Sequence, residues 1–255
     1  PLDSTGEATR QVVSLANSLV PCAILGTDDQ SAMLAATVAT RQDLLSPNPD
    51  AVRNCTNKYR FRKTCAVLGL STIEFQLFPS TTTANHAARE LNVAYPCVLK
   101  PVLLSASRGV VRADTGEEFV QAFRRIQTLL DSREFVGVED PDHKQILVEA
   151  FVPGKEVAVE AMMNQGDLKV LAIFDKPDDL DGPYFEETVY ITPSRKAVEL
   201  IEEIEISLER YCRAIGLLHG PIHAAARVNR EQIHWLEIAP RTIGGLCSRM
   251  FNIAS

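Results

Sequence analysis

The chain has 255 residues and 45% of them are hydrophobic, so it can bury a substantial core, and its length predicts one or two domains. The formal net charge of −7 weighs against nucleic acid as a partner, because phosphate backbones require a basic surface. No apolar run reaches the roughly 20 residues that cross a bilayer, and no signal peptide opens the chain, which predicts a cytoplasmic protein without a membrane partner.

The first residue is Pro1 rather than a methionine, and it stands close to a helical pattern, so we expect this sequence to be a fragment of a longer polypeptide. The six cysteines lie far apart, without CxxC spacing or flanking histidines. They therefore predict small buried residues rather than a metal cluster.

The first elements alternate between helix and strand, which is typical of half of an open parallel sheet. Two prolines and an asparagine in residues 44–52 mark a boundary after them. In chain order we expect a helix over 5–19, an apolar strand over 21–29, a helix over 31–41, a helix over 52–68 and a strand over 71–78.

The rest of the chain predicts shorter strands, two more helices and a final hairpin. We expect a helix over 82–92, a strand over 95–102, a small-residue loop over 105–109, a strand over 110–113, a helix over 115–130, strands over 146–152, 155–163, 168–176 and 185–193, a helix over 194–215, and hairpin strands over 221–228 and 233–239. Two lobes joined by an extended segment form a natural cleft.

Two segments of the middle region carry candidate ligand-binding residues. Lys100 lies in an otherwise apolar strand, so its ammonium must reach solvent or meet an anion. The nearby "SASRG" has small side chains that let backbone N–H groups approach a phosphate chain. In "VEAFVPGKEVAVE", the backbone of Phe151 and Val152 can meet an adenine edge, and Glu156 can accept from ribose hydroxyls. Each segment alone is equally compatible with an ordinary surface strand or hairpin.

Together and in this order, these segments resemble the ATP-grasp family, from about Arg53 to Arg249. "NKYRFRKTCAVLGLS" is similar to the helix with the family's first nucleotide lysine, here Lys58, and "YPCVLKP" to the strand with the second, Lys100. "SASRGV" is similar to the flexible loop over the phosphates, "VEAFVPGKEVAVE" to the adenine and ribose segment, and "LEIAPRTIGG" to the catalytic end.

The resemblance implies an α/β and α+β architecture: an ATP-grasp fold with two α+β lobes enclosing a nucleotide cleft, preceded by part of a Rossmann-like domain. The implied division is a partial N-terminal α/β domain over 1–52 and an ATP-grasp domain over 53–255, with lobes 53–148 and 149–255. The implied nucleotide-binding residues are Lys58, Lys100, Ser105, Ser107, Arg108, Gly109, Glu149, Phe151, Val152 and Glu156.

The implied reaction moves the γ-phosphoryl group of ATP to a carboxylate, and an amine then attacks the acylphosphate. Because two anions must meet, cations have to surround the phosphates: Lys58, Lys100 and Arg108 from one side, and Mg²⁺ (or Mn²⁺) with Arg241 from the other. Lys100 and Arg241 are the implied catalytic residues. Glu237 is the implied metal ligand, since Mg²⁺ takes carboxylate oxygens.

Two alanines depart from the family pattern. The family usually has a second metal-binding glutamate about twelve residues before the first, where this chain has Ala225, and often an asparagine where it has Ala239. Three interpretations stay open: an active enzyme in which Glu160, Glu186 or Glu187 substitutes, a damaged copy of an active enzyme, or a module that binds nucleotide without turnover.

The substrates implied by the resemblance are a small-molecule carboxylate and an amine. Arg227, Arg249 and Glu187 are candidate substrate contacts, although ordinary surface positions explain them equally well. We expect His219 and His223 to be structural, and Trp235 to share a strand face with Glu237. An enzyme that uses bicarbonate, similar to biotin carboxylase or carbamoyl-phosphate synthase, is the enzymatic alternative, and a homodimer is left open.

Overall fold

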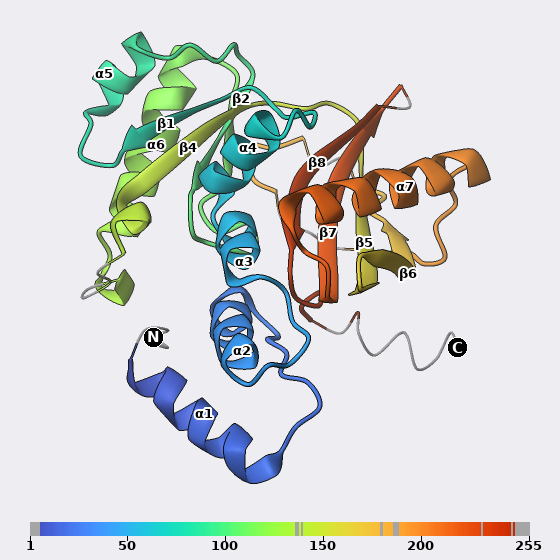
Figure 1. The fold of residues 1–255 in the computed structure, drawn as a ribbon. Coiled ribbons are helices and arrows are strands. Elements are labelled where there is room, and N and C mark those ends of the chain that lie inside the picture. Colours follow the sequence, from blue (N-terminus) through green and yellow to red (C-terminus); the bar gives the residue numbers. More distant parts are fainter. Residues whose placement is uncertain are drawn as a thin grey trace.

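The computed structural model describes residues 6–135, 138, 140–178, 181–185, 189–230, 232–245 and 247. It contains two four-stranded sheets, each antiparallel in every pairing of the described residues. Figure 1 shows them side by side, with β1–β4 in one sheet and β5–β8 in the other. The first has the order β1 (Phe75–Pro79), β4 (Gln145–Ala150), β2 (Cys97–Pro101), β3 (Val111–Ala113), and the second β6 (Asp167–Asp175), β5 (Lys155–Asn164), β7 (Gly220–Asn229), β8 (Gln232–Ala239).

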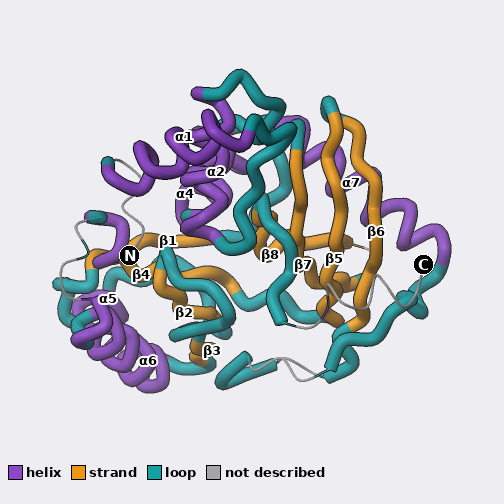
Figure 2. Tube along the Cα trace, turned by 90° about the horizontal axis from the view of Figure 1, so that it is seen from below, coloured by secondary structure: helices purple, strands orange, loops and turns teal. Residues whose placement is uncertain are grey.

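Helices cover one face of each sheet. The helices of the described residues are α1 (Glu7–Leu19), α2 (Asp29–Arg41), α3 (Pro49–Thr56), α4 (Lys58–Val67), α5 (Ala84–Arg89), α6 (Gly116–Leu130) and α7 (Val198–Ile215), with short 3₁₀ turns at Arg133–Phe135 and Pro141–Lys144. Figure 2 shows α5 and α6 together beside β2 and β3, and α7 beside the second sheet. This layering leaves the opposite face of each sheet for other contacts.

The first core lies between α5, α6 and the first sheet. Phe119 and Phe123 of α6 are fully buried there, and Phe123 packs edge-on against Phe78 of β1. Because side chains alternate along a strand, Leu99 of β2 points into this core while Lys100 points to the opposite face.

The second core lies under the second sheet and is closed by α3, α4 and α7. Tyr211 of α7, Phe61 of α4 and Trp235 of β8 are all buried in it. In β5 and β7, the residues that alternate with the core residues point to the opposite face of the sheet. Glu156 and His223 are among them, and both are buried polar groups. The polar faces of both sheets therefore border the space between them.

Arg62 of α4 links the two sheets through a guanidinium that is 1% exposed. Its Nε donates to Glu149 Oε1 of β4 at 2.6 Å, while its terminal nitrogens donate to the carbonyls of Trp235 (2.7 Å) and Leu236 (3.0 Å) in β8. Glu149 also accepts from Lys100 of β2. One planar donor group thus holds an acid of the first sheet and the backbone of the second.

Two extended segments also cross between the sheets. The chain passes from β4 to β5 through Phe151–Gly154, where Gly154 has φ +122° and a Cβ there would lie 2.3 Å from Val228 O. In the second segment, Tyr184 forms a β-bridge with Val111 of β3, and Arg125 of α6 donates to the Tyr184 hydroxyl at 3.0 Å.

Most predicted elements are confirmed with shifted ends, and three predictions are wrong. Residues 21–28 form no strand, since nothing in the described chain pairs with them. The helix predicted over 52–68 is two helices, because Asn57 is extended (φ −110°, ψ 111°) and caps α4 by accepting from Arg60 N. Of the strand predicted over 185–193, residues 186–188 lie outside the described residues, and the others form only a bridge between Ile191 and Asp175.

The predicted division into domains meets this packing at two places. The border after residue 52 falls inside α3, whose Ala51 and Cys55 belong to the second core. The border between lobes falls inside β4. The division therefore stays a prediction, while α3 and α4 pack against the second sheet.

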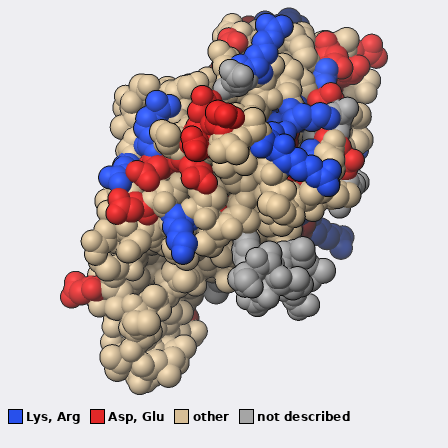
Figure 3. All heavy atoms as spheres, turned by 90° about the vertical axis from the view of Figure 1, so that its right-hand side faces the viewer, with Lys and Arg blue, Asp and Glu red and all other residues tan. Residues whose placement is uncertain are grey.

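The described surface carries charges of both signs. On the face seen in Figure 3, acidic and basic side chains lie interspersed among uncharged residues. No helix within the described part of the chain is both long and apolar enough to cross a membrane.

We predict that Gly154→Ala lowers the free energy of unfolding by about 3 kcal/mol, because the new methyl group meets the Val228 carbonyl in a backbone region that favours glycine. The matched control is Gly69→Ala, where φ is +67° and a Cβ meets nothing within 4 Å, so only about 1 kcal/mol of backbone strain is expected. Denaturant unfolding of both variants measures the difference. Equal losses would contradict the steric argument.

Arg62→Lys should destabilise the protein by about 3 kcal/mol or more, because an ammonium does not reproduce the planar donors that satisfy Glu149 and two buried carbonyls. Arg60→Lys on the same helix is the control, since Arg60 pairs with Asp142 in a partly exposed position and should lose less than about 1 kcal/mol. A shift in the urea midpoint no larger for Arg62→Lys than for Arg60→Lys would refute the linking role of Arg62.

Candidate active site

A pocket of about 690 Å³ lies between the polar faces of the two sheets. Its walls come from the start of α2, the start of α4, strands β2, β4, β5, β7 and β8, and the loops after β2, β4 and β8. Of the predicted nucleotide, metal and catalytic residues, the pocket is lined by Lys58, Lys100, Ser105, Ser107, Glu149, Phe151, Val152, Glu156, Glu237 and Arg241.

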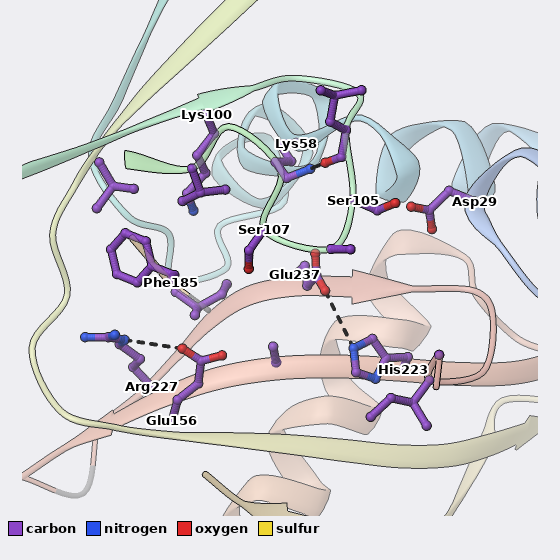
Figure 4. A pocket seen from close by; sticks show the side chains of 18 of the residues that line it. Asp29, Lys58, Lys100, Ser105, Ser107, Glu156, Phe185, His223, Arg227 and Glu237 are labelled. Atoms are coloured by element: carbon purple, nitrogen blue, oxygen red, sulfur yellow. Dashed lines mark hydrogen bonds and ion pairs between the residues drawn. The ribbon is translucent and has the colours of Figure 1, made fainter. Parts of the chain in front are cut away.

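The two predicted lysines enter the pocket from the side of the first sheet, across from Glu156 and His223 (Figure 4). Lys58 is the first residue of α4, and its backbone N–H donates to Val102 O at 3.2 Å. Its ammonium donates to Leu104 O in the loop after β2. Burial lowers the pKa of Lys58, and the nearby Glu237 carboxylate opposes that shift. An anion in the pocket would favour the charged lysine in the same way.

The loop after β2 divides into pocket-lining and outward residues. Leu104, Ser105, Ala106 and Ser107 line the pocket, and two of them, Ala106 and Ser107, have φ of +54°. Arg108 points elsewhere, because its guanidinium pairs with Glu134 at 2.7 Å and lies over the Phe135 ring. Gly109 is enclosed by Leu129 and Pro101, which leave no room for a Cβ.

Glu149 is a buried acceptor between two cations. Arg62 and Lys100 each bind one of its carboxylate oxygens. Burial alone would raise its pKa, but these two cations lower the pKa of Glu149 to about 2. Glu149 therefore stays charged and holds the Lys100 ammonium at the pocket wall.

The segment after β4 is less open than the sequence suggests. We expected free backbone groups at Phe151 and Val152, but Phe151 N donates to Pro96 O at 3.0 Å, and Val152 O accepts from Arg227 at 2.9 Å. The Phe151 carbonyl and the Val152 N–H form no hydrogen bond with other described residues. One acceptor and one donor thus remain for an adenine edge.

Glu156 and Arg227 face each other on neighbouring strands, and Figure 4 shows the ion pair between them. Arg227 Nε lies 3.5 Å from Glu156 Oε2, and the buried Lys176 Nζ lies 2.6 Å from Oε1. The Arg227 guanidinium also stacks over the Phe151 ring at 5.0 Å. Arg227 was a candidate contact for a substrate carboxylate, and in the structure its donors meet acceptors of the protein.

Glu237 projects into the pocket from β8, beside His223 of β7 (Figure 4). His223 Nε2 lies 3.6 Å from Glu237 Oε1, and His223 Nδ1 lies 2.5 Å from Glu160 Oε1. Burial opposes the charged imidazole, but the two carboxylates raise the pKa of His223 to about 9. Burial also opposes the charged form of Glu237, yet His223, Lys58 and Arg241 hold its pKa well below the usual range.

Arg241 is anchored by Asp29, which the sequence did not single out. Its Nε donates to Asp29 Oδ1 at 2.6 Å, and Nη1 donates to Thr242 O at 3.1 Å. Asp29 opens α2 and lies 212 positions away in the sequence. No local pattern signals a contact between such distant residues.

The alanines at the departures from the family pattern lie on the pocket face of the sheet. Ala225 stands opposite Glu237 in the register, and Ala239 stands opposite His223. Trp235 was expected on the face of Glu237, and that expectation is wrong. A bulge between Ala225 and Ala226 shifts the alternation, so Trp235 is 3% exposed in the second core and donates to Ser207 Oγ at 3.0 Å.

Three predicted residues, Glu186, Glu187 and Arg249, lie outside the described residues. Glu160, which we considered as a substitute metal ligand, is engaged by His223 and by the backbone N–H of Ile243 at 2.9 Å. His219 was expected to be structural, and its Nδ1 accepts from Gln165 N at 3.3 Å in a turn. Sequence reasoning missed several polar residues in or beside the pocket, among them Arg62, Asp28, Asp29 and Lys176.

The pocket fits a divalent cation at one carboxylate. Among the described residues, no group of three or more His, Cys, Asp or Glu side chains could hold a metal ion. Glu237 Oε2, however, has no hydrogen-bond or ion-pair partner there, and Mg²⁺ bound to nucleotide needs only one or two protein carboxylates. The residues present therefore suit a cation that phosphates help to hold.

We predict that Glu149→Gln removes about 3 kcal/mol of stability at neutral pH, because the pKa of Glu149 falls from 4.5 unfolded to about 2 folded. A depressed pKa gives stability above pH 4.5 that is lost as the pH falls towards 2, so the difference between wild type and variant should shrink across that window. Urea titrations at pH 3, 4 and 7 measure it. A difference independent of pH would contradict the charge assignment.

Comparison with known proteins places this geometry in a family. The model for the ATP-grasp domain matches residues 93–250, which is more than half of the chain. An ATP-grasp enzyme of Aspergillus fumigatus, fsqD, is 26% identical over 208 residues, covering 76% of this chain and 33% of that protein.

Solved structures give the same picture. The L-amino acid ligase of Bacillus licheniformis superposes with a TM-score of 0.78 at 27% identity, covering 93% of this chain and 55% of that chain. A biotin carboxylase of Campylobacter jejuni superposes with a TM-score of 0.70 at 13% identity, covering 95% and 54%, and shows the fold alone. The chain spans about a third to a little over half the length of these proteins. It belongs to the ATP-grasp family.

Proposed function

We propose that this chain carries the nucleotide site of an ATP-dependent ligase that activates a carboxylate as an acylphosphate for attack by an amine, with release of ADP. The observation that carries the proposal is the charge arrangement of the pocket. Lys58 and Arg241 lie close enough to Glu237 to stabilise its charge, Lys100 lines the same pocket, and Glu237 keeps an open oxygen. This arrangement suits a reaction in which two anions are brought together.

The cations would act from opposite sides of the transferred phosphoryl group. Lys58 and Lys100 lie on the side of the first sheet, where they are suited to neutralise the phosphate oxygens of ATP. Arg241 follows the end of β8, and its pairing with Asp29 fixes the guanidinium before substrate binds. Donors that are oriented in advance need no reorganisation when charge develops in the transition state.

The other end of the pocket suits the nucleoside. The Phe151 carbonyl and the Val152 N–H offer the acceptor and donor that an adenine edge requires. Glu156 stays an acceptor for ribose hydroxyls, because a carboxylate has more lone pairs than Lys176 and Arg227 use. In Figure 4, Ser107 lies between Lys100 and Glu237, where a phosphate chain would run, and Ser105 lies beside Asp29.

Glu237 would hold the Mg²⁺ or Mn²⁺ of the bound nucleotide, and the cation would supply further neutralisation of the phosphates. The predicted division, with residues 1–52 as part of a preceding α/β domain and 53–255 as the ATP-grasp domain, belongs to the same proposal. The proposal also includes a small-molecule acid and an amine as substrates, and assembly as a homodimer.

Two alternatives address the same pocket. A carboxylase would use bicarbonate instead of an organic acid, and only the fold of the biotin carboxylase supports it. A nucleotide-binding module without turnover would fit the loss of oxygen ligands at Ala225 and Ala239. The ligase is favoured because Lys58, Lys100, Glu237 and Arg241 all keep their places around the pocket.

The test is ADP release by the full-length protein with ATP and Mg²⁺ across a panel of amino acids and small acids. We expect release only when an acid and an amine are both present. Arg241→Lys should lower the rate by about 10²-fold while leaving nucleotide affinity nearly unchanged, and Arg124→Lys on the exposed face of α6 is the matched control. Tight ATP binding without stimulation of ADP release by any acid–amine pair would contradict the ligase proposal. Stimulation of ADP release by bicarbonate alone would favour the carboxylase.

A further inference from the structure

The carboxylates around the pocket are mostly committed to other groups of the protein. Arg62 and Lys100 occupy the two oxygens of Glu149. Glu156 meets Lys176 at 2.6 Å and Arg227 at 3.5 Å. Neither acid can bind a divalent cation without giving up a buried ion pair, which is costly.

Three further acids near the pocket are engaged by other groups of the protein through one or both oxygens. One oxygen of Glu160 meets His223 Nδ1 at 2.5 Å, and the other accepts from Ile243 N at 2.9 Å. Asp29 Oδ1 binds Arg241 at 2.6 Å. Asp28 Oδ1 caps α2 by accepting from the backbone N–H groups of Gln30 and Ser31, so each aspartate is engaged through one oxygen.

The positions beside Glu237 on the sheet carry no oxygen atoms in their side chains. Ala225 stands opposite Glu237 in β7, and Ala158 stands opposite Ala225 in β5, so this row across the strands reads alanine, alanine, glutamate. Ala239, two residues after Glu237, adds no ligand either. A second cation would therefore meet methyl groups here.

His223 takes up the space on one side of the Glu237 carboxylate. Its Nε2 lies 3.6 Å from Oε1, and its other ring nitrogen faces Glu160 (Figure 4). With both ring nitrogens directed at carboxylate oxygens, the imidazole is oriented to donate rather than to ligate a metal. Only Oε2 remains for a cation.

We propose that the nucleotide-bound protein holds a single divalent cation, at Glu237 Oε2, because Ala225 supplies no oxygen ligand for a second cation and Oε1 faces His223. Phosphate oxygens and water complete the octahedral shell, as suits Mg²⁺ and Mn²⁺ with one protein carboxylate. The inference rests on the proposed function, because it requires nucleotide in this pocket.

The test counts Mn²⁺ by electron paramagnetic resonance while bound nucleotide is measured separately, using the full-length protein and an imido analogue of ATP that is not hydrolysed. The expected result is one Mn²⁺ per bound nucleotide at saturation. Two Mn²⁺ per nucleotide would overturn the single-cation site and leave the proposed function standing. Absence of nucleotide binding at every Mn²⁺ concentration would overturn the proposed function and this inference with it.

Two variants of one residue locate the missing ligand. Ala225→Glu should raise the count from one to two Mn²⁺ per nucleotide, whereas Ala225→Gln, which has the same size without a carboxylate, should keep it at one. Circular dichroism and thermal unfolding check that both variants fold. The Mn²⁺ count of the wild-type protein tests the single-cation site whether or not the variants fold. A count of one for a folded, nucleotide-bound Ala225→Glu would contradict the role given to residue 225.

Discussion

The buried guanidinium of Arg62 is the contact on which the geometry of the pocket depends. It binds Glu149 in the first sheet and two carbonyls of β8 in the second, so it fixes the spacing of the pocket walls. Arg62 stands one helical turn after Lys58 in α4, and Glu149 in turn holds Lys100. Lys58 and Lys100 are thus positioned by one network, and Glu237 follows Trp235 and Leu236, whose carbonyls accept from Arg62.

Much of this fold could be predicted from local patterns, because alternation and capping residues act over a few positions. The polar faces of β2, β5 and β7 follow from their period of two. The strand expected over 21–29 has the right composition, but a strand also needs a partner, and composition carries no information about partners. Trp235 fails for a similar reason, since one extra residue in a bulge reverses the face of every residue before it.

The residues of the site also differ in whether local sequence patterns could identify them. Those matching a family motif, such as Lys100 and Glu237, were identified from the sequence and line the pocket. Arg62 and Asp29 were missed because their partners lie 87 to 212 positions away, and nothing local distinguishes them from surface charges. Motifs thus identify the groups that face a ligand, while the groups that hold them in place become visible only through the fold.

The contacts that join the two sheets differ in the free energy needed to break them. The Arg62 network is buried, so separating its charges would expose an unpaired acid and two carbonyls at a cost of several kcal/mol. The contacts of Tyr184 with Val111 and Arg125 form at an exposed position and are each worth about 1 kcal/mol. The Tyr184 contacts are therefore the cheaper of the two connections to break, and the Arg62 network is the one that holds the pocket walls at their spacing.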